Sequence, residues 1–203
     1  IIGIAQKALA AGKRVQVSVQ SAFGCGYEGP VPKDRVVAIV QTFLGAGLRG
    51  LSLADTAGHA TPDQVEDLFA RVRALDEGAE WTCHFHDTYG LALTNCYAAH
   101  RTGVRYFESS VAGLGGCPFT KVAGGNTCTE DLVHALHQDG FRTDIQLSAL
   151  LDVARDVARF FGRDMAGAYF EVVPKSNFRA LGIVAAGPIG RDLSKVVDRV
   201  WNG

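Results

Sequence analysis

Residues 80–87 read EWTCHFHD, a largely apolar run that ends in two histidines and an aspartate. Such a run, with aromatic residues and apolar positions, is typical of a β-strand. In a strand, positions i and i+2 face the same side, so His84 and His86 would point together and Phe85 would point the other way. The stretch therefore predicts a strand whose carboxyl end carries chemically active side chains.

The segments around this strand repeat a strand followed by a helix. The predicted strands are 14–20, 49–56, 80–87 and 104–111, and the predicted helices are 32–48, 61–78, 90–103, 127–140 and 145–162. This alternation predicts an α/β fold with a parallel sheet and right-handed crossovers. Two architectures fit it, an open doubly wound sheet and a TIM (β/α)8 barrel.

Polar residues at the strand ends favour the barrel. Besides the histidines, the strands end in Gln20-Ser21, Asp55-Thr56 and Ser109-Ser110. In a barrel, all carboxyl strand ends line one mouth, which holds the active site. A complete barrel has eight strands and roughly 250 residues. We therefore predict the C-terminal half of a barrel, about strands 5–8, over residues 1–162, followed by a partly helical tail over 163–203.

Composition excludes several classes of protein. The chain has 203 residues, is 47% apolar and 20% charged, and has a formal net charge of -1. This balance predicts no broad basic surface for nucleic acid, and the short apolar runs predict no membrane span. Five cysteines with no CxxC pair favour a reduced, intracellular protein. The uncapped helical pattern at residues 1–13 suggests that the chain is part of something longer.

The paired histidines raise the possibility of a metal site. Neutral imidazole is a common metal ligand, but two polar residues at a strand end also suit ordinary hydrogen bonds. Asn126 follows a glycine-rich loop, 111–126, that opens at the same mouth. Its side chain suits either a helix N-cap or a ligand of a hard cation. Mg²⁺ or Mn²⁺ would want an additional carboxylate, and Zn²⁺ with Cys117 is an alternative.

Three further residues are candidates at this mouth. Cys117, between Gly116 and Pro118, is either a small buried residue or a reactive thiol near a metal. Asp55 ends the apolar strand LSLAD and is either a cap for the following loop or a site residue, and its convergence with the histidines favours the site. Ser52 interrupts the same strand and is predicted to contact substrate.

Four blocks of the sequence resemble 3-hydroxy-3-methylglutaryl-CoA lyase, of the HMGL-like group of metal-dependent lyases and Claisen synthases on a TIM barrel. They are SLADTAGHATP, HFHDTYGLALTN, SSVAGLGGCPF and GGNTCTEDLV, in matching order and spacing across about residues 14–160. The resemblance implies that His84, His86 and Asn126 bind a divalent cation, Mg²⁺ or Mn²⁺. It also implies catalytic roles for Cys117, Asp55 and His84.

The resemblance implies cleavage of 3-hydroxy-3-methylglutaryl-CoA to acetoacetate and acetyl-CoA. The group's remaining ligand, an aspartate after a catalytic arginine in a DRDG-like sequence, does not occur in this chain, which agrees with the half-barrel prediction. Alternatives are a lyase for a related short branched 3-hydroxyacyl-CoA, a Claisen synthase, and a non-catalytic subunit that keeps the scaffold. We expect an acyl-CoA substrate, a homodimer, and a location in the cytoplasm, or in the mitochondrial matrix if the source is eukaryotic.

Overall fold

The computed structural model describes residues 1–116, 124–162 and 167, and all of them belong to one compact unit, Ile1–Phe170. Cys117 and nearly all of the predicted tail lie outside the described residues. The predicted boundary at residue 162 therefore stays a prediction. No helix of the described ranges is long and apolar enough to cross a membrane.

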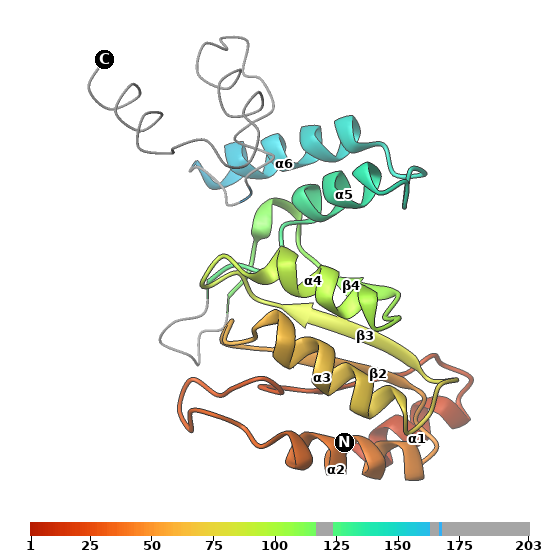
Figure 1. The fold of residues 1–203 in the computed structure, drawn as a ribbon. Coiled ribbons are helices and arrows are strands. Elements are labelled where there is room, and N and C mark those ends of the chain that lie inside the picture. The colour runs from red at the N-terminus through yellow and green to blue at the C-terminus, as the bar shows by residue number, and fades with distance from the viewer. Residues whose placement is uncertain (117–123, 163–166, 168–203) are drawn as a thin grey trace. The chain divides into compact units, whose positions relative to one another are not determined.

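Four parallel strands form one sheet (Figure 1). They are β1 Gln16–Val19, β2 Gly50–Asp55, β3 Glu80–Phe85 and β4 Tyr106–Glu108, paired in sequence order. Each lies inside a predicted strand, and each is shorter because the predicted ranges included loop residues at the ends. The parallel α/β sheet that the strand and helix alternation predicts is confirmed.

The helices are α1 Ile2–Ala10, α2 Lys33–Gly45, α3 Pro62–Arg73, α4 Ala92–Arg101, α5 Thr129–Gln138 and α6 Leu147–Phe161, with a short 3₁₀ turn, η1, at Val111–Gly113. Helices α2, α3 and α4 connect the strands as predicted, while α1 precedes β1 and α5 and α6 follow β4. The start of α3 shows how local sequence sets the limits of a helix. Thr61 and Gln64 form a reciprocal capping box, and Pro62 occupies the first helical position.

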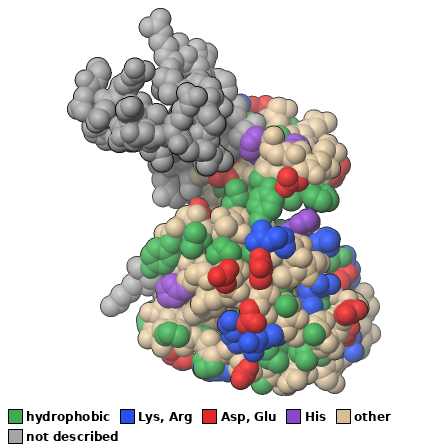
Figure 2. Space-filling view, viewed as in Figure 1, with side chains coloured by type: hydrophobic (Ala, Val, Ile, Leu, Met, Phe, Trp, Pro, Cys, Tyr) green, Lys and Arg blue, Asp and Glu red, His purple; other side chains and the backbone are tan. Residues whose placement is uncertain are grey.

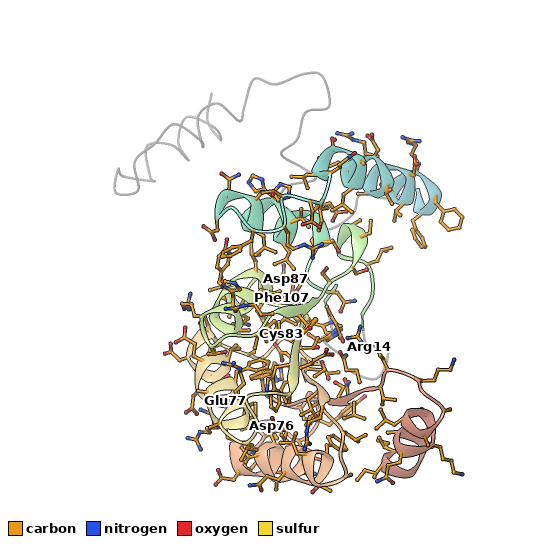
Figure 3. All side chains as sticks on the ribbon, turned by 90° about the vertical axis from the view of Figure 1, so that its right-hand side faces the viewer. Arg14, Asp76, Glu77, Cys83, Asp87 and Phe107 are labelled. Carbon is orange, nitrogen blue, oxygen red and sulfur yellow. The ribbon has the colours of Figure 1, made fainter. Side chains whose placement is uncertain are left out.

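The hydrophobic core lies between the sheet and the helices α2, α3 and α4, which cover one face (Figures 1 and 3). Alternate strand residues point into this layer, including Leu51, Leu53 and Cys83, and each is at most 1% exposed. Burying a side chain of this size contributes about 1.5–3 kcal/mol relative to leaving it in water. The core therefore fixes which residues of each strand face the other way, and these are largely polar.

The polar face of the sheet is concave. Gln16 on β1 donates from Nε2 to Oε1 of Glu108 on β4 at 2.5 Å, although these strands are the two edges of the sheet. In a flat sheet, three strand spacings would hold the two backbones about 14 Å apart, beyond this reach. The contact therefore requires curvature, as in a segment of a barrel.

Both edges of the sheet are open within the described part of the chain, since β1 and β4 each pair on one side. Beside β4 lies a cavity of about 480 Å³, lined in part by Tyr106, Phe107, Leu136 and Phe141. A barrel closes only when every strand has two neighbours. The described sheet is thus a partial barrel, as predicted.

The helix-covered face carries charges of both signs. Lys33 pairs with Asp67, and Arg71 pairs with Asp34, across α2 and α3; Arg71 also pairs with Asp67 within α3. Figure 2 shows the basic side chains (blue) and the acidic side chains (red) interspersed on this face, without a broad area of one charge. Such exposed pairs contribute little stability, typically about 0–1 kcal/mol each.

Candidate metal and catalytic site

The structure brings His84 and His86 together at the carboxyl end of β3. Their ring centroids are 5.1 Å apart in an edge-to-face arrangement. Phe85 points the other way and is fully buried in the core. The predicted geometry of the pair, two imidazoles on one face of a strand, is therefore present.

Both rings have a partner at Nδ1. Nδ1 of His86 lies 3.0 Å from the carbonyl oxygen of Gly124, and since a carbonyl only accepts, this nitrogen carries the proton. Nδ1 of His84 lies 2.9 Å from Oε2 of Glu108, close enough for an ion pair but poorly aligned for a hydrogen bond. Metal-binding histidines have this arrangement, because a proton on Nδ1 leaves the lone pair of Nε2 free. In both residues, Nε2 is the atom available to a cation.

The backbones of Asn126 and His86 form an isolated antiparallel bridge. Nδ2 of Asn126 donates to the carbonyl oxygen of Leu114 at 2.8 Å, while its Oδ1 is buried with no hydrogen-bond partner among the described residues. An unpaired buried acceptor costs about 1–3 kcal/mol. A bound cation would satisfy it.

The alternative role of Asn126 as a helix cap is wrong. Helix α5 begins at Thr129, and its N-cap is Cys128, two residues further along the chain. The side-chain oxygen of Asn126 is therefore not used to hold the helix start.

The donor set fits a hard divalent cation in part. Two imidazole nitrogens and one amide oxygen are neutral, and Mg²⁺ or Mn²⁺ is usually bound by one or two carboxylates and several waters as well. Within residues 1–116 and 124–162, no group of three His, Cys, Asp or Glu side chains could hold a metal. The described residues would thus supply one side of a cation site and leave positions for a carboxylate, water or substrate.

Asp55 is fully buried and organises the loop after β2. Its two carboxylate oxygens accept the backbone N–H groups of His59 at 2.8 Å and Ala60 at 2.9 Å. Burial raises the pKa of this carboxyl, and these hydrogen bonds oppose the rise. Asp55 pairs in register with Phe85 on β3. It therefore lies on the helix-covered face of the sheet, whereas His84 lies on the concave face. The structure gives Asp55 the loop-capping role that the sequence also allowed, and its catalytic role stays a prediction.

Ser52 lies on the concave face, in register with Ser18 and Thr82. It is fully buried, and its Oγ has no hydrogen-bond partner among the described residues. An unpaired hydroxyl on this face suits a polar ligand, which is compatible with the predicted substrate contact but does not test it.

Cys117 lies outside the described residues, so the structure does not place its thiol. The two ends of its loop are described, and glycines let them meet. A Cβ on Gly125 would lie 2.1 Å from the carbonyl oxygen of Gly113, and one on Gly115 would lie 2.3 Å from Nδ2 of Asn126. Only glycine permits such close approach. The loop that carries Cys117 therefore starts and ends in contact with the residues that position Asn126.

Sequence reasoning missed two carboxylates near this site. Glu108 contacts His84, and its position on the same face of the neighbouring strand was the available signal. Glu130 is fully buried and accepts the backbone N–H of Ala112 with both oxygens, at 3.1 and 3.0 Å. Ala112 has a φ of 55°, a left-handed conformation that is uncommon for alanine. Glu130 thus holds the strained turn from which the glycine-rich loop departs.

Comparison with known proteins gives a consistent match. The HMGL-like family model matches residues 1–157. The hydroxymethylglutaryl-CoA lyase of Pseudomonas mevalonii is 39% identical over 149 residues, 73% of this chain and 50% of that protein. The mitochondrial hydroxymethylglutaryl-CoA lyase of Mus musculus is 39% identical over 161 residues, 79% of this chain and 50% of that protein.

A solved structure matches the fold as well. An HMG-CoA lyase from Acinetobacter baumannii, in complex with coenzyme A and 3-methylmalate, superposes with a TM-score of 0.79 at 35% identity, covering 88% of this chain and 58% of that one. The chain spans about half the length of the curated relatives it matches.

Proposed function

The chain belongs to the HMGL-like family, and from that premise we propose that it supplies the metal-binding part of a lyase that cleaves 3-hydroxy-3-methylglutaryl-CoA to acetoacetate and acetyl-CoA. Three observations support the proposal: the ring centroids of His84 and His86 are 5.1 Å apart, the backbones of His86 and Asn126 form a bridge, and Oδ1 of Asn126 is buried with no partner among the described residues. The relatives with the printed name hydroxymethylglutaryl-CoA lyase support the reaction.

Mg²⁺ or Mn²⁺ is the proposed cofactor, held by Nε2 of both histidines and Oδ1 of Asn126. When bound, such a cation polarises substrate oxygens and lowers the pKa of a hydroxyl group. Because the three protein ligands are neutral, a carboxylate from outside the described residues is needed for strong binding.

The reaction needs two proton transfers. The tertiary hydroxyl of the substrate loses its proton, the adjacent carbon–carbon bond breaks, and the electron pair passes to the acetyl-CoA fragment as an enolate. That fragment then takes a proton on carbon. We assign the second proton transfer to the thiol of Cys117, on the loop whose ends contact Asn126. Asp55 would orient a different loop, the one that follows β2. His84 would act on the hydroxyl through the cation that its Nε2 would hold, and Ser52 would contact the substrate.

The proposed substrate class is an acyl-CoA, and the coenzyme A bound to the Acinetobacter baumannii relative supports it. A homodimer stays a prediction. The relatives include bacterial and mitochondrial proteins, so we propose the bacterial cytoplasm or the mitochondrial matrix as the compartment.

The test is cleavage of 3-hydroxy-3-methylglutaryl-CoA with Mg²⁺, measured as acetyl-CoA release. It compares the 203-residue chain alone with a hybrid barrel, in which this chain is joined to the part of the Pseudomonas mevalonii lyase that it does not match. We expect turnover by the hybrid barrel and none by the chain alone, because four strands with two open edges cannot enclose a substrate.

Two results would contradict the proposal. A folded hybrid barrel that binds Mn²⁺ but leaves the substrate intact would exclude this lyase activity. Turnover by the chain alone at the rate of the hybrid barrel would show that the four described strands need no completion.

A further inference from the structure

Glu108 and His84 are direct neighbours across two strands. They are paired in register on β3 and β4 and lie on the concave face of the sheet. Oε2 of Glu108 is 2.9 Å from Nδ1 of His84, which leaves no room for water between them. The carboxylate of Glu108 is therefore the partner of Nδ1 of His84, and Nε2 on the other side of the ring is left for the proposed cation.

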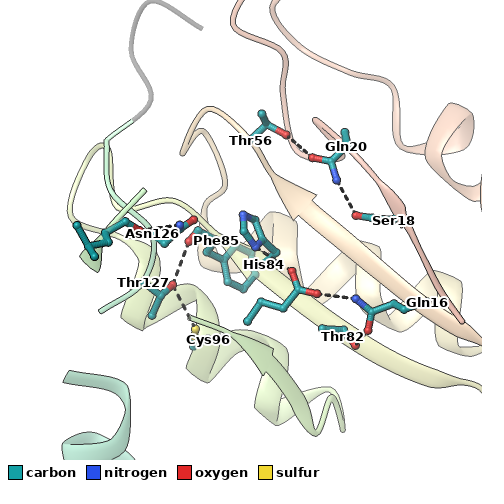
Figure 4. Close-up of polar contacts among 12 residues, drawn as sticks. Gln16, Ser18, Gln20, Thr56, Thr82, His84, Phe85, Cys96, Asn126 and Thr127 are labelled. Carbon is teal, nitrogen blue, oxygen red and sulfur yellow. Dashed lines mark hydrogen bonds and ion pairs between the residues drawn. The ribbon is translucent and has the colours of Figure 1, made fainter. Parts of the chain in front are cut away.

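The other oxygen of Glu108 is also held. Gln16 donates from Nε2 to Oε1 of Glu108 at 2.5 Å, and Thr82 donates from Oγ1 to Oε1 of Gln16 at 2.9 Å (Figure 4). With both oxygens engaged, Glu108 has a defined orientation. The amide of Gln16 has one defined orientation as well, because the hydroxyl of Thr82 and the carboxylate of Glu108 fix which end of it donates. The resulting chain of contacts runs from Thr82 through Gln16 and Glu108 to His84.

We infer that Glu108, held by Gln16 and Thr82, is a positioning residue that fixes His84 as the tautomer protonated on Nδ1 and so directs its Nε2 lone pair at a divalent cation. The inference rests on the proposed function only for the identity of the cation site. Its physical basis is electrostatic: at 2.9 Å an unprotonated Nδ1 would place its lone pair against the carboxylate oxygen, so a proton on Nδ1 is favoured even though the contact is poorly aligned for a hydrogen bond. Carboxylate partners of this kind orient metal-binding histidines and raise their basicity.

The matched control for Glu108 is Glu80. Glu80 lies on β3, on the same face of the sheet as Glu108. Its side chain is about half exposed, like that of Glu108, and it pairs with Arg14 at 3.0 Å and not with a histidine. Glu108→Ala removes the acceptor, Glu108→Gln keeps an acceptor oxygen without the charge, and Glu80→Gln removes a charge from the same face without touching His84.

The first readout is the tautomer of His84 in the metal-free 203-residue chain, from long-range ¹H–¹⁵N correlation spectra at a pH where the ring is neutral. His84→Asn assigns the signals. We expect the Nδ1–H form in the wild type and in Glu80→Gln, and a shift toward the Nε2–H form in Glu108→Ala. Glu108→Gln should retain much of the Nδ1–H form, because its amide oxygen still accepts.

The second readout is the affinity for Mn²⁺ alone, measured by titration in the hybrid barrel. We expect Glu108→Ala to weaken binding by about 10–100-fold, Glu108→Gln to fall between it and the wild type, and Glu80→Gln to bind like the wild type. A purely structural role would lower the melting temperature of Glu108→Ala without changing the tautomer.

Unchanged tautomer and unchanged Mn²⁺ affinity in both Glu108 variants would overturn the inference, even if the hybrid barrel is an active lyase. Conversely, the expected tautomer shift and loss of affinity in a hybrid barrel without lyase activity would support the inference and contradict the proposed function. The two ideas therefore fail on different measurements.

Discussion

His86→Ala in the hybrid barrel is expected to lower kcat/KM for 3-hydroxy-3-methylglutaryl-CoA by about 10³-fold or more. The substitution removes one of three proposed ligands, and a bound cation stabilises the transition state by several kcal/mol, each 1.36 kcal/mol being tenfold in rate. It also leaves the carbonyl of Gly124 without its partner at 3.0 Å. Steady-state kinetics with Mg²⁺, together with Mn²⁺ titration, measure both parts of the effect.

The control for this substitution is His137→Ala. His137 lies on α5, and its Nε2 contacts the carbonyl oxygen of Arg142, away from the candidate site. Its replacement should leave kcat/KM near the wild-type value. If His86→Ala retained wild-type activity and Mn²⁺ affinity, His86 would not be a metal ligand.

Cys117→Ala is expected to lower kcat by about 10²-fold or more, the usual contribution of a general acid or base. Mn²⁺ affinity should persist, because the proposed ligands are untouched. The melting temperature should change little if the thiol acts in proton transfer and not in packing. The measurement is kcat at saturating substrate beside a thermal unfolding curve, both in the hybrid barrel.

Cys83→Ala gives the opposite expectation and so serves as the comparison. Cys83 is fully buried in the core, on the helix-facing side of β3. Its replacement should lower the melting temperature through lost packing and leave kcat almost unchanged. A near-normal kcat in Cys117→Ala would remove this thiol from the proposed catalytic groups.

Local sequence was sufficient to predict the elements of the fold. Alternating β-branched residues marked β1, and Thr61, Pro62 and Gln64 marked the start of α3. The pair of histidines was also predictable, because side-chain alternation in a strand follows directly from spacing. These features depend on residues close together in the chain.

The missed features depend on the curvature of the sheet. Gln16 and Glu108 are 92 residues apart in sequence and lie on opposite edges of the sheet, so only the curved fold brings them into contact. Asn126 could not be assigned from sequence either, because a ligand and a helix cap prefer the same side chain. The start of α5 at Thr129 excludes the cap, and the ligand role, which the unpaired Oδ1 of Asn126 supports, stays a proposal.

The role of Asp55 shows a further limit of sequence reasoning. Its place at the end of β2 predicted convergence with the histidines, but Asp55 shares a face of β2 with Leu51 and Leu53 and pairs in register with Phe85. The carboxylate turns to the backbone N–H groups of His59 and Ala60. The alternation of β2 was the available signal, because it puts Asp55 on the opposite face from Ser52.

The most direct test of the central claim is the position of Mn²⁺ in crystals of the hybrid barrel, measured by anomalous diffraction. The account predicts one peak roughly 2.0–2.3 Å from Nε2 of His84, Nε2 of His86 and Oδ1 of Asn126. A peak elsewhere, or the absence of a peak near these three atoms at saturating Mn²⁺, would contradict it.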